Sequence, residues 1–209
     1  MSPGDEQRRG RGRPRTPGAE DKILGAALDE YGERGWAGFT MDGVARRAGV
    51  GKSTVYLRWP DKDALLTDAV TNRGMALTAV DTGTFEGDLE QLALNLLRHF
   101  HTAAGWAALR VTFDCAGASE RLGEFSQAVS QVHGRQVEQI CQRAIDRGEM
   151  MEGFPLGAVT EAIYGAAMVN SLSERLEGRT DDDAAIRTRA NAVVAMVLSG
   201  IAAAAPRSG

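Results

Sequence analysis

The sequence predicts an all-α protein that consists of a small N-terminal helical domain and a larger C-terminal one. Apolar residues recur at intervals of three and four positions along most of the chain, and no alternating pattern reaches the length of a useful strand. With 43% apolar residues among 209, the chain has enough apolar material for a buried core. We expect a polar, disordered arm over residues 1–15, a first domain over residues 16–62 and a second over residues 63–205.

Two helices are predicted before residue 50. The first begins at Thr16, a capping residue that is followed by Pro17, and it ends where Gly35 interrupts the helical pattern. The second follows the capping residue Thr40 and ends at Gly49, which suits the left-handed conformation of a helix stop. Their inward faces carry Ile23, Ala27, Leu28, Tyr31, Met41, Val44, Ala45 and Ala48.

Two further short helices follow directly. The third is predicted from about Gly51 to Trp59, because Pro60 cannot continue a helix. Asp61 is a typical cap for the fourth, which buries Leu65 and three further apolar residues. The first domain therefore contains two short helices joined by a glycine-containing turn.

Longer helices are predicted in the rest of the chain. Apolar residues from Leu89 to Phe100 follow helical spacing, and further helices are expected over Ser119 to Arg147, Leu156 to Leu176 and Asp182 to Ala204. The last helix is apolar on nearly all sides from Ala192 onward, which one chain is not expected to bury. We therefore expect a homodimer that pairs the last two helices of both chains in a four-helix bundle.

Several features indicate a cytoplasmic protein that is not embedded in a membrane. The apolar run from Ala192 to Ala205 is interrupted by Ser199 and is shorter than a membrane span of roughly 18 residues, so we interpret it as a buried helix. The charged N-terminus lacks the apolar centre of a secretory signal. The two cysteines, Cys115 and Cys141, have no partner at CxxC spacing; burial is the first expectation for both, and a thiol sensor is the alternative.

Charge is unevenly distributed along the chain. Residues 1–60 carry 11 Lys and Arg against 8 Asp and Glu, whereas the remainder carries 13 against 20. A basic front on an acidic body indicates that an anionic polymer contacts one end only.

The segment GVGKST at residues 49–54 is close to a phosphate-binding loop, which would indicate a nucleotide-hydrolysing enzyme. That loop requires another glycine five positions before Gly51, where this sequence has Arg46. A phosphate-binding loop also follows an apolar strand, whereas the segment that precedes GVGKST, MDGVARRA, has the pattern of an amphipathic helix. We therefore predict no such site.

The second and third helices together predict a helix-turn-helix, which places its second helix in the major groove of DNA. If Val50, Val55 and Trp59 point inward, the outer face presents cations, hydroxyls and one apolar side chain. Lys and Arg reach guanine edges or phosphates, hydroxyls bind either, and Leu contacts thymine methyl groups. The predicted DNA-binding residues are Thr40, Lys52, Ser53, Thr54, Tyr56, Leu57, Arg58 and Lys62.

The stretch FTMDGVARRAGVGKSTVYLRWPDKDALL, residues 39–66, resembles the DNA-binding domain of TetR-family transcriptional regulators, and the preceding ILGAALDEYGERGWAG extends the resemblance. The resemblance implies a dimeric repressor that a small molecule releases from operator DNA, although some members activate transcription. The family's common Ser at the head of the recognition helix is Gly51 here, and its usual aromatic pair before the lysine is Arg58 and Trp59.

The N-terminal arm carries a second signal for DNA. Arg11, Gly12, Arg13 and Pro14 resemble the core of an AT-hook, in which Arg11 and Arg13 would enter a narrow A·T-rich minor groove. The alternative is a basic tail that only increases solubility.

The second domain is expected to bind the effector. Small-molecule pockets in helical domains are apolar with a few polar groups, and the candidate lining residues are Phe100, Trp106, Phe113, Phe125, Tyr164 and Met168. Each of these also suits ordinary core packing. We expect no cofactor. We also expect no metal, because His99 and His101 are two residues apart and do not share a helix face.

The favoured hypothesis is a ligand-responsive, homodimeric DNA-binding repressor. An all-α enzyme is the first alternative, but no nucleophile and base occur at a readable spacing. The second alternative is a helical adaptor whose first domain binds protein instead of DNA.

Overall fold

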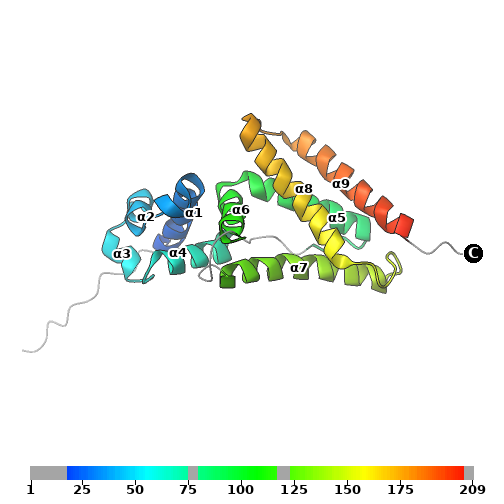
Figure 1. Ribbon diagram of the computed structural model, residues 1–209, viewed down its shortest axis with the longest axis horizontal. Coiled ribbons are helices and arrows are strands. Elements are labelled where there is room, and N and C mark those ends of the chain that lie inside the picture. The colour runs from blue at the N-terminus through cyan, green and yellow to red at the C-terminus, as the bar shows by residue number, and fades with distance from the viewer. Residues whose placement is uncertain (1–17, 75–79, 117–122, 205–209) are drawn as a thin grey trace, which may run out of the picture.

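A computed structural model describes residues 18–74, 80–116 and 123–204 of the chain, which are helical with short connections (Figure 1). The N-terminal half contains α1 (Ala19–Gly38), α2 (Met41–Ala48), α3 (Lys52–Tyr56), α4 (Lys62–Ala69) and the π-helical turn η1 (Val70–Gly74). The C-terminal half contains α5 (Phe85–His101), α6 (Ala103–Ala116), α7 (Gly123–Asp146), α8 (Leu156–Glu177) and α9 (Asp183–Ala204). The predicted all-α fold is confirmed.

The helix boundaries of the first domain follow from local capping. The predicted start at Thr16 and Pro17 lies outside the described residues, and α1 begins after Gly18, which is left-handed at φ 79°. Gly35, at φ 62°, interrupts α1 where the sequence indicates, but one further turn continues to Gly38. The Thr40 side chain accepts a hydrogen bond from the Gly43 amide at 3.0 Å, as predicted.

The other stop and start signals are also confirmed. Gly49 ends α2 in the left-handed conformation at φ 66°. Asp61 caps α4 by accepting from the amide of Ala64 at 2.8 Å. The third helix is shorter than predicted. It spans only Lys52–Tyr56, and the chain then turns toward Pro60.

Two apolar cores lie at the two ends of the molecule. The first unites α1 to α4, and the second unites α5, α7, α8 and α9. The buried residues of the first core include every predicted inward residue of α1, together with Val55 and Trp59, which fix α3 from beneath.

Helix α6 belongs to both cores, and the sequence analysis did not predict it. Its residues Ala107, Ala108 and Val111 pack in the first core, while Leu109 packs in the second. In Figure 1, α6 stands between the two halves of the molecule. Helix α6 therefore joins α1 to the second core by direct packing.

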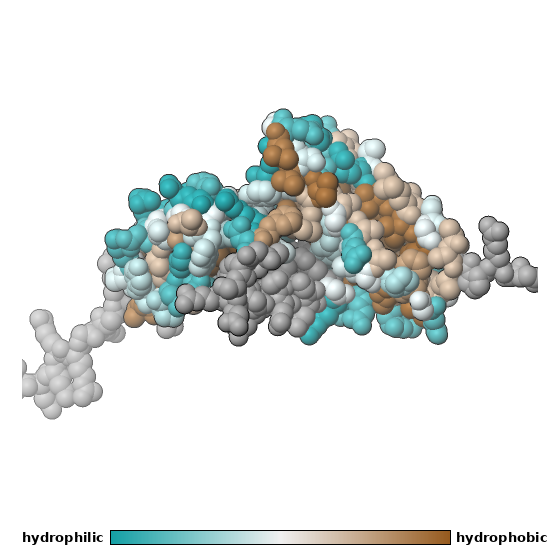
Figure 2. Space-filling model, viewed as in Figure 1, coloured by the Kyte–Doolittle hydropathy of each residue, from teal (hydrophilic) through white to brown (hydrophobic). Residues whose placement is uncertain are grey.

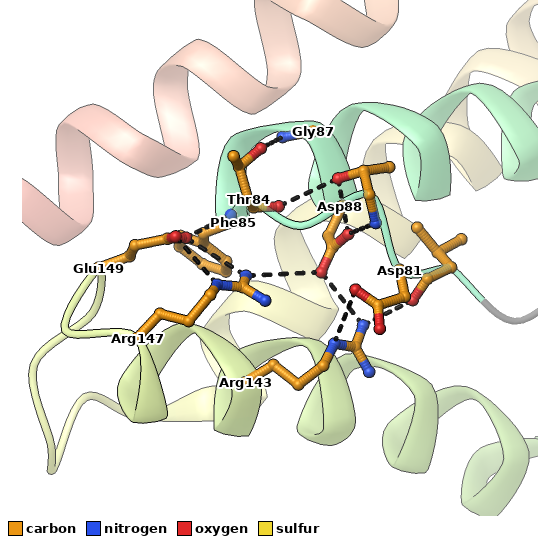
Figure 3. Close-up of polar contacts among 10 residues, drawn as sticks. Asp81, Thr84, Phe85, Gly87, Asp88, Arg143, Arg147 and Glu149 are labelled. Carbon is orange, nitrogen blue, oxygen red and sulfur yellow. Dashed lines mark hydrogen bonds and ion pairs between the residues drawn. The ribbon is translucent and has the colours of Figure 1, made fainter.

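A buried polar cluster ties α5 to the end of α7 (Figure 3). Asp88 is fully buried and accepts from the amide and the hydroxyl of Thr82 at 2.6 and 2.8 Å. Arg143 donates to Asp88 at 3.1 Å and to the carbonyl of Val80 at 2.6 Å, and Arg147 lies 3.8 Å from Asp88. We call these residues the Asp88 cluster.

Apolar residues gather on the outside of α8 and α9 (Figure 2). Only Ile186, Ala190, Val194 and Ile201 of α9 are buried within the chain, and Met196 is 67% exposed. The expectation of a buried helix is thus met on one side of α9. By length and composition, α9 is the one helix in the described part of the chain that could cross a membrane, with 22% of its apolar window buried. The same composition is typical of a helix that is buried between protein surfaces.

Candidate DNA-binding surface

The turn between α2 and α3 presents α3 at the surface of the first domain. Gly51 precedes α3 in an extended conformation, and its carbonyl accepts from the amide of Thr54 at 2.9 Å. Val55 is buried beneath the helix, and the indole of Trp59 donates to Asp68 of α4 at 2.7 Å. These contacts set the face of α3 that points outward.

The outward face of α3 and the two residues that follow the helix carry most of the predicted DNA-binding side chains. Leu57 is 86% exposed and Tyr56 51%, so two adjacent large side chains are available to a partner surface. Lys52 and Ser53 are exposed as well, while Thr54 and Arg58 are partly exposed.

Two cations of this surface have weak partners within the chain. Lys52 pairs with the exposed Asp42 of α2. Arg58 donates to the carbonyl of Thr54 at 3.2 Å and lies 3.9 Å from the exposed Glu20. Exposed ion pairs of this kind contribute at most about 1 kcal/mol, so a phosphate or a base can replace the carboxylate.

Lys62 and Thr40 lie at helix starts. The ammonium of Lys62 donates to the carbonyl of Trp36 at 3.2 Å and lies 3.9 Å from the centre of its ring, which holds the side chain in place. The Thr40 oxygen accepts from Gly43, which leaves its hydroxyl proton to be donated.

The structure adds Arg46 to the candidate residues. It lies in the last turn of α2 and is exposed, and its side chain has no hydrogen bond or ion pair within residues 18–74, 80–116 and 123–204. The sequence analysis did not select it, although a cation beside the turn of a helix-turn-helix is a usable signal.

Helix α2 is held on α1 by a buried carboxylate. Glu30 is buried and pairs with Arg34 at 3.0 Å and with Arg47 of α2 at 3.1 Å. A Cβ atom at Gly43 would lie 2.3 Å from a carboxylate oxygen of Glu30, so a larger residue there would displace this carboxylate. Arg47 also binds Glu33 at 2.9 Å, and this hydrogen bond lowers the pKa of Glu33. The orientation of α2 therefore depends on α1.

Helix α6 contacts the end of α1 through polar side chains. The guanidinium of Arg110 donates to the carbonyl of Gly32 at 3.0 Å, and it lies where a side chain at Gly35 would be. Tyr31 of α1 donates a hydrogen bond to Asp114 of α6. These contacts join the surface that carries α3 to the C-terminal half.

The predicted effector-site residues separate into two groups. Phe100 and Tyr164 are buried, and Trp106 and Met168 pack against the same second core. Tyr164 donates to Gln136 at 3.3 Å, and burial raises its pKa. Phe113 is half exposed on α6, and the side chain of Phe125 lies outside the described residues.

Cys141 is buried in the second core, in agreement with the first expectation for the cysteines, which was burial. Burial raises the pKa of its thiol to about 11, so the thiolate is scarce at neutral pH. The side chain of Cys115 lies outside the described residues.

A helix-turn-helix with an exposed second helix, carried on a helical body, defines a class of transcriptional regulator. Residues 23–69 match the bacterial regulatory proteins of the tetR family, and residues 79–193 match the tetracyclin repressor-like C-terminal domain. The chain is 31% identical over 157 residues to the HTH-type transcriptional regulator YdeS of Bacillus subtilis. The matched region covers 74% of this chain and 79% of that protein. The chain belongs to the TetR family of transcriptional regulators, which are not enzymes.

Two further similarities concern regulators of fatty acid metabolism. The fatty acid metabolism regulator protein of Bacillus subtilis is 23% identical over 186 residues, covering 86% of this chain and 94% of that protein. The solved structure of the transcriptional regulator FadR from Bacillus subtilis in complex with stearoyl-CoA superposes with a TM-score of 0.71 at 17% identity, covering 87% of this chain and 98% of that chain. This second likeness shows the shared fold.

Proposed function

We propose that the protein is a cytoplasmic, homodimeric, ligand-responsive repressor that binds a palindromic operator. The observation that carries the proposal is the outward face of α3, where Tyr56 and Leu57 are exposed beside Lys52 and Arg58. In this arrangement α3 enters the major groove, while Thr40 and Lys62 bind phosphates at two helix starts.

Arg58 and Lys62 are expected to differ in what they contribute to binding. Replacing Arg58 by alanine removes a base contact, which should cost about 1–3 kcal/mol on the preferred sequence and relax specificity. Replacing Lys62 by alanine removes a phosphate contact, which should weaken binding to all sequences alike and reduce the salt slope by about 1. A titration of specific and scrambled duplexes at two salt concentrations measures both effects.

Arg135→Ala is the matched control, because it removes an exposed cation from α7 in the C-terminal half. It should leave affinity for both duplexes nearly unchanged. Equal losses on specific and scrambled DNA for Arg58→Ala would contradict base recognition by this residue. A thermal melt of Lys62→Ala separates DNA binding from the loss of its contact with Trp36.

The outer faces of α8 and α9 support the proposed dimer. Exposed or partly exposed residues of α8 recur at alternating intervals of four and three positions, the spacing of a helix that packs along a partner helix. They are Ala158, Ala162, Gly165, Val169, Leu172 and Leu176. The exposed face of α9 is rich in small residues, which allow helices to approach closely. We call the α8 row the seam.

We infer that the effector carries a long acyl chain. Support comes from the relatives, one of which is named a fatty acid metabolism regulator and one of which was solved with stearoyl-CoA. In this chain, Phe100 and Met168 offer apolar contacts in the second core, and Tyr164 adds one polar group. The ligand would act through α6, which packs in both cores.

Stearoyl-CoA is the probe for this inference, and coenzyme A alone is its control. A ligand at 100 times its dissociation constant adds about 2.7 kcal/mol of stability, so the melting temperature should rise with stearoyl-CoA only. If the ligand favours the DNA-incompetent state by about 3 kcal/mol, DNA affinity should fall roughly a hundredfold. A stable complex that leaves DNA affinity unchanged would contradict the effector role.

A further inference from the structure

A groove runs along one side of α1, at the junction of the two halves of the molecule. It consists of two adjoining hollows of about 640 and 330 Å³, which share Asp29 and Ala103. The α1 wall of the groove is one helix face, formed by residues 21, 24, 25, 28, 29, 32 and 33. The opposite wall is the connection from α5 to α6. We call this feature the junction groove.

The junction groove combines acidic groups with short apolar ones. Asp21 and Asp29 lie two turns apart on its α1 wall, about 12 Å along the helix axis. The carboxylate of Asp29 has no hydrogen bond or ion pair within the described residues, and both hollows include this residue. The larger hollow has no cation among its lining residues, and Ala103 and Ala104 form its opposite side. The groove therefore suits a narrow chain that carries positive charges.

The smaller hollow shows what kind of group this surface accepts. The guanidinium of Arg175 lies 4.1 Å from the centre of the Trp106 ring, and both residues line the hollow together with Asp29 and Glu33. A planar cation of the chain itself is thus accommodated at one end of the groove. The larger hollow shares Asp29 with the smaller one and adds Asp21.

The segment of the chain that precedes α1 has the matching chemistry and length. Residues 8–15 read RRGRGRPR, five arginines among small residues and one proline. Gly18 begins the described chain at the end of α1 that carries Asp21. An extended chain covers about 3.3 Å per residue, so Arg13 reaches about 16 Å back from Gly18. Asp29 lies the same distance from Gly18 along α1, at 1.5 Å per residue.

We propose that residues 8–15 dock in the junction groove, antiparallel to α1, with arginines beside Asp21 and Asp29. The attachment at Gly18 keeps the segment at a millimolar effective concentration, so weak contacts suffice. Docking holds the arginines away from DNA and bridges α1 to the start of α6. DNA, which is the stronger polyanion, competes for the same arginines. Only this competition rests on the proposed function, because the docking itself needs no DNA.

Trypsin cleavage of the full chain without DNA tests the docking. Trypsin cuts after Arg11 and Arg15, and protection follows the fraction of the segment that is docked. If two-thirds is docked, the double variant Asp21→Asn and Asp29→Asn should be cleaved about threefold faster than the wild type at low salt. The difference should disappear at about 1 M salt, where charges are screened within about 3 Å. Mass spectrometry measures the two cleavage rates.

Glu86→Gln is the control for a carboxylate removed elsewhere, because it neutralises one exposed side chain of α5, and its cleavage rates should equal those of the wild type. Equal rates for the wild type and the double variant, with both melting normally, would overturn the docking. The competition has a separate test, in which the double substitution should increase DNA affinity more in the full chain than in a chain that lacks residues 1–15. An equal gain in both chains would overturn the competition.

Discussion

Replacing Asp88 by asparagine is expected to lower the free energy of unfolding by about 3 kcal/mol at pH 7. Asp88 is fully buried and pairs with Arg143 and Arg147, and removing one partner of a buried ion pair leaves the other uncompensated. The asparagine has nearly the same shape, so the loss reports on charge and not on packing. Urea unfolding of both proteins, followed by circular dichroism, measures the difference.

The loss should also depend on pH in a predictable direction. Burial raises the pKa of Asp88, but hydrogen bonds from Thr82 and the contacts with Arg143 outweigh it, so the pKa is lowered overall. A lowered pKa in the folded state contributes stability above the ordinary Asp value of about 3.9, and this stability is lost as pH falls through the lower folded value. The difference between wild type and Asp88→Asn should therefore shrink below about pH 4.

Asp81→Asn is the control for the Asp88 cluster. Asp81 lies 3.7 Å from Arg143, but its side chain is exposed, so the substitution should cost at most about 1 kcal/mol. Equal costs for the two substitutions, or a cost of Asp88→Asn that does not change with pH, would show that the buried charge is not what stabilises this end of α5.

Replacing Leu172 by glutamate is expected to dissociate the dimer and to weaken operator binding by about a hundredfold or more. Leu172 lies in the middle of the seam, so two copies would bring two carboxylates into an apolar interface. Operator affinity falls because, without the dimer, a helix-turn-helix bound at one half-site no longer holds a second one near the other half-site. Analytical ultracentrifugation at micromolar concentration and a titration with a palindromic duplex measure the two effects.

The fold of the single chain should survive this substitution, because Leu172 is 39% exposed within it. Leu172→Met conserves volume and should leave the dimer intact. If Leu172→Glu does not fold, Leu176→Glu gives the same test at a position that is 79% exposed. Dimers of normal affinity for both glutamate variants would exclude the seam as the interface.

The helices of the first domain could be predicted from the sequence because their limits depend on neighbouring residues. The caps Thr40 and Asp61 bind amides three residues ahead, and Gly49 adopts a conformation that its own backbone permits. The exposure of α3 could also be predicted, since Val55 and Trp59 determine which face is inside. Arg46 was missed because the sequence does not indicate which of two adjacent arginines is paired, and only the structure places Arg47 against Glu30 and Glu33.

The connection between the two halves could not be predicted. Helix α6 has an alanine-rich sequence, AAGWAALRVTFDCA, with no clear apolar face, because two different cores share it. Its contacts with α1 join residues about eighty positions apart, Tyr31 to Asp114 and Arg110 to Gly32. The junction groove arises from the same packing, so no local pattern indicates it.

The sequence by itself determined the helical class, the helix-turn-helix, the family and the apolar excess of the last helix, because each follows from residue types at short spacing. Only the tertiary structure decided which charges are buried, as for Glu30 and Asp88, and which helix joins the two halves. It also decided that most of α9 is left uncovered by its own chain. Burial and pairing depend on residues that folding brings together from distant positions, and their energies are set by an environment that no short segment contains.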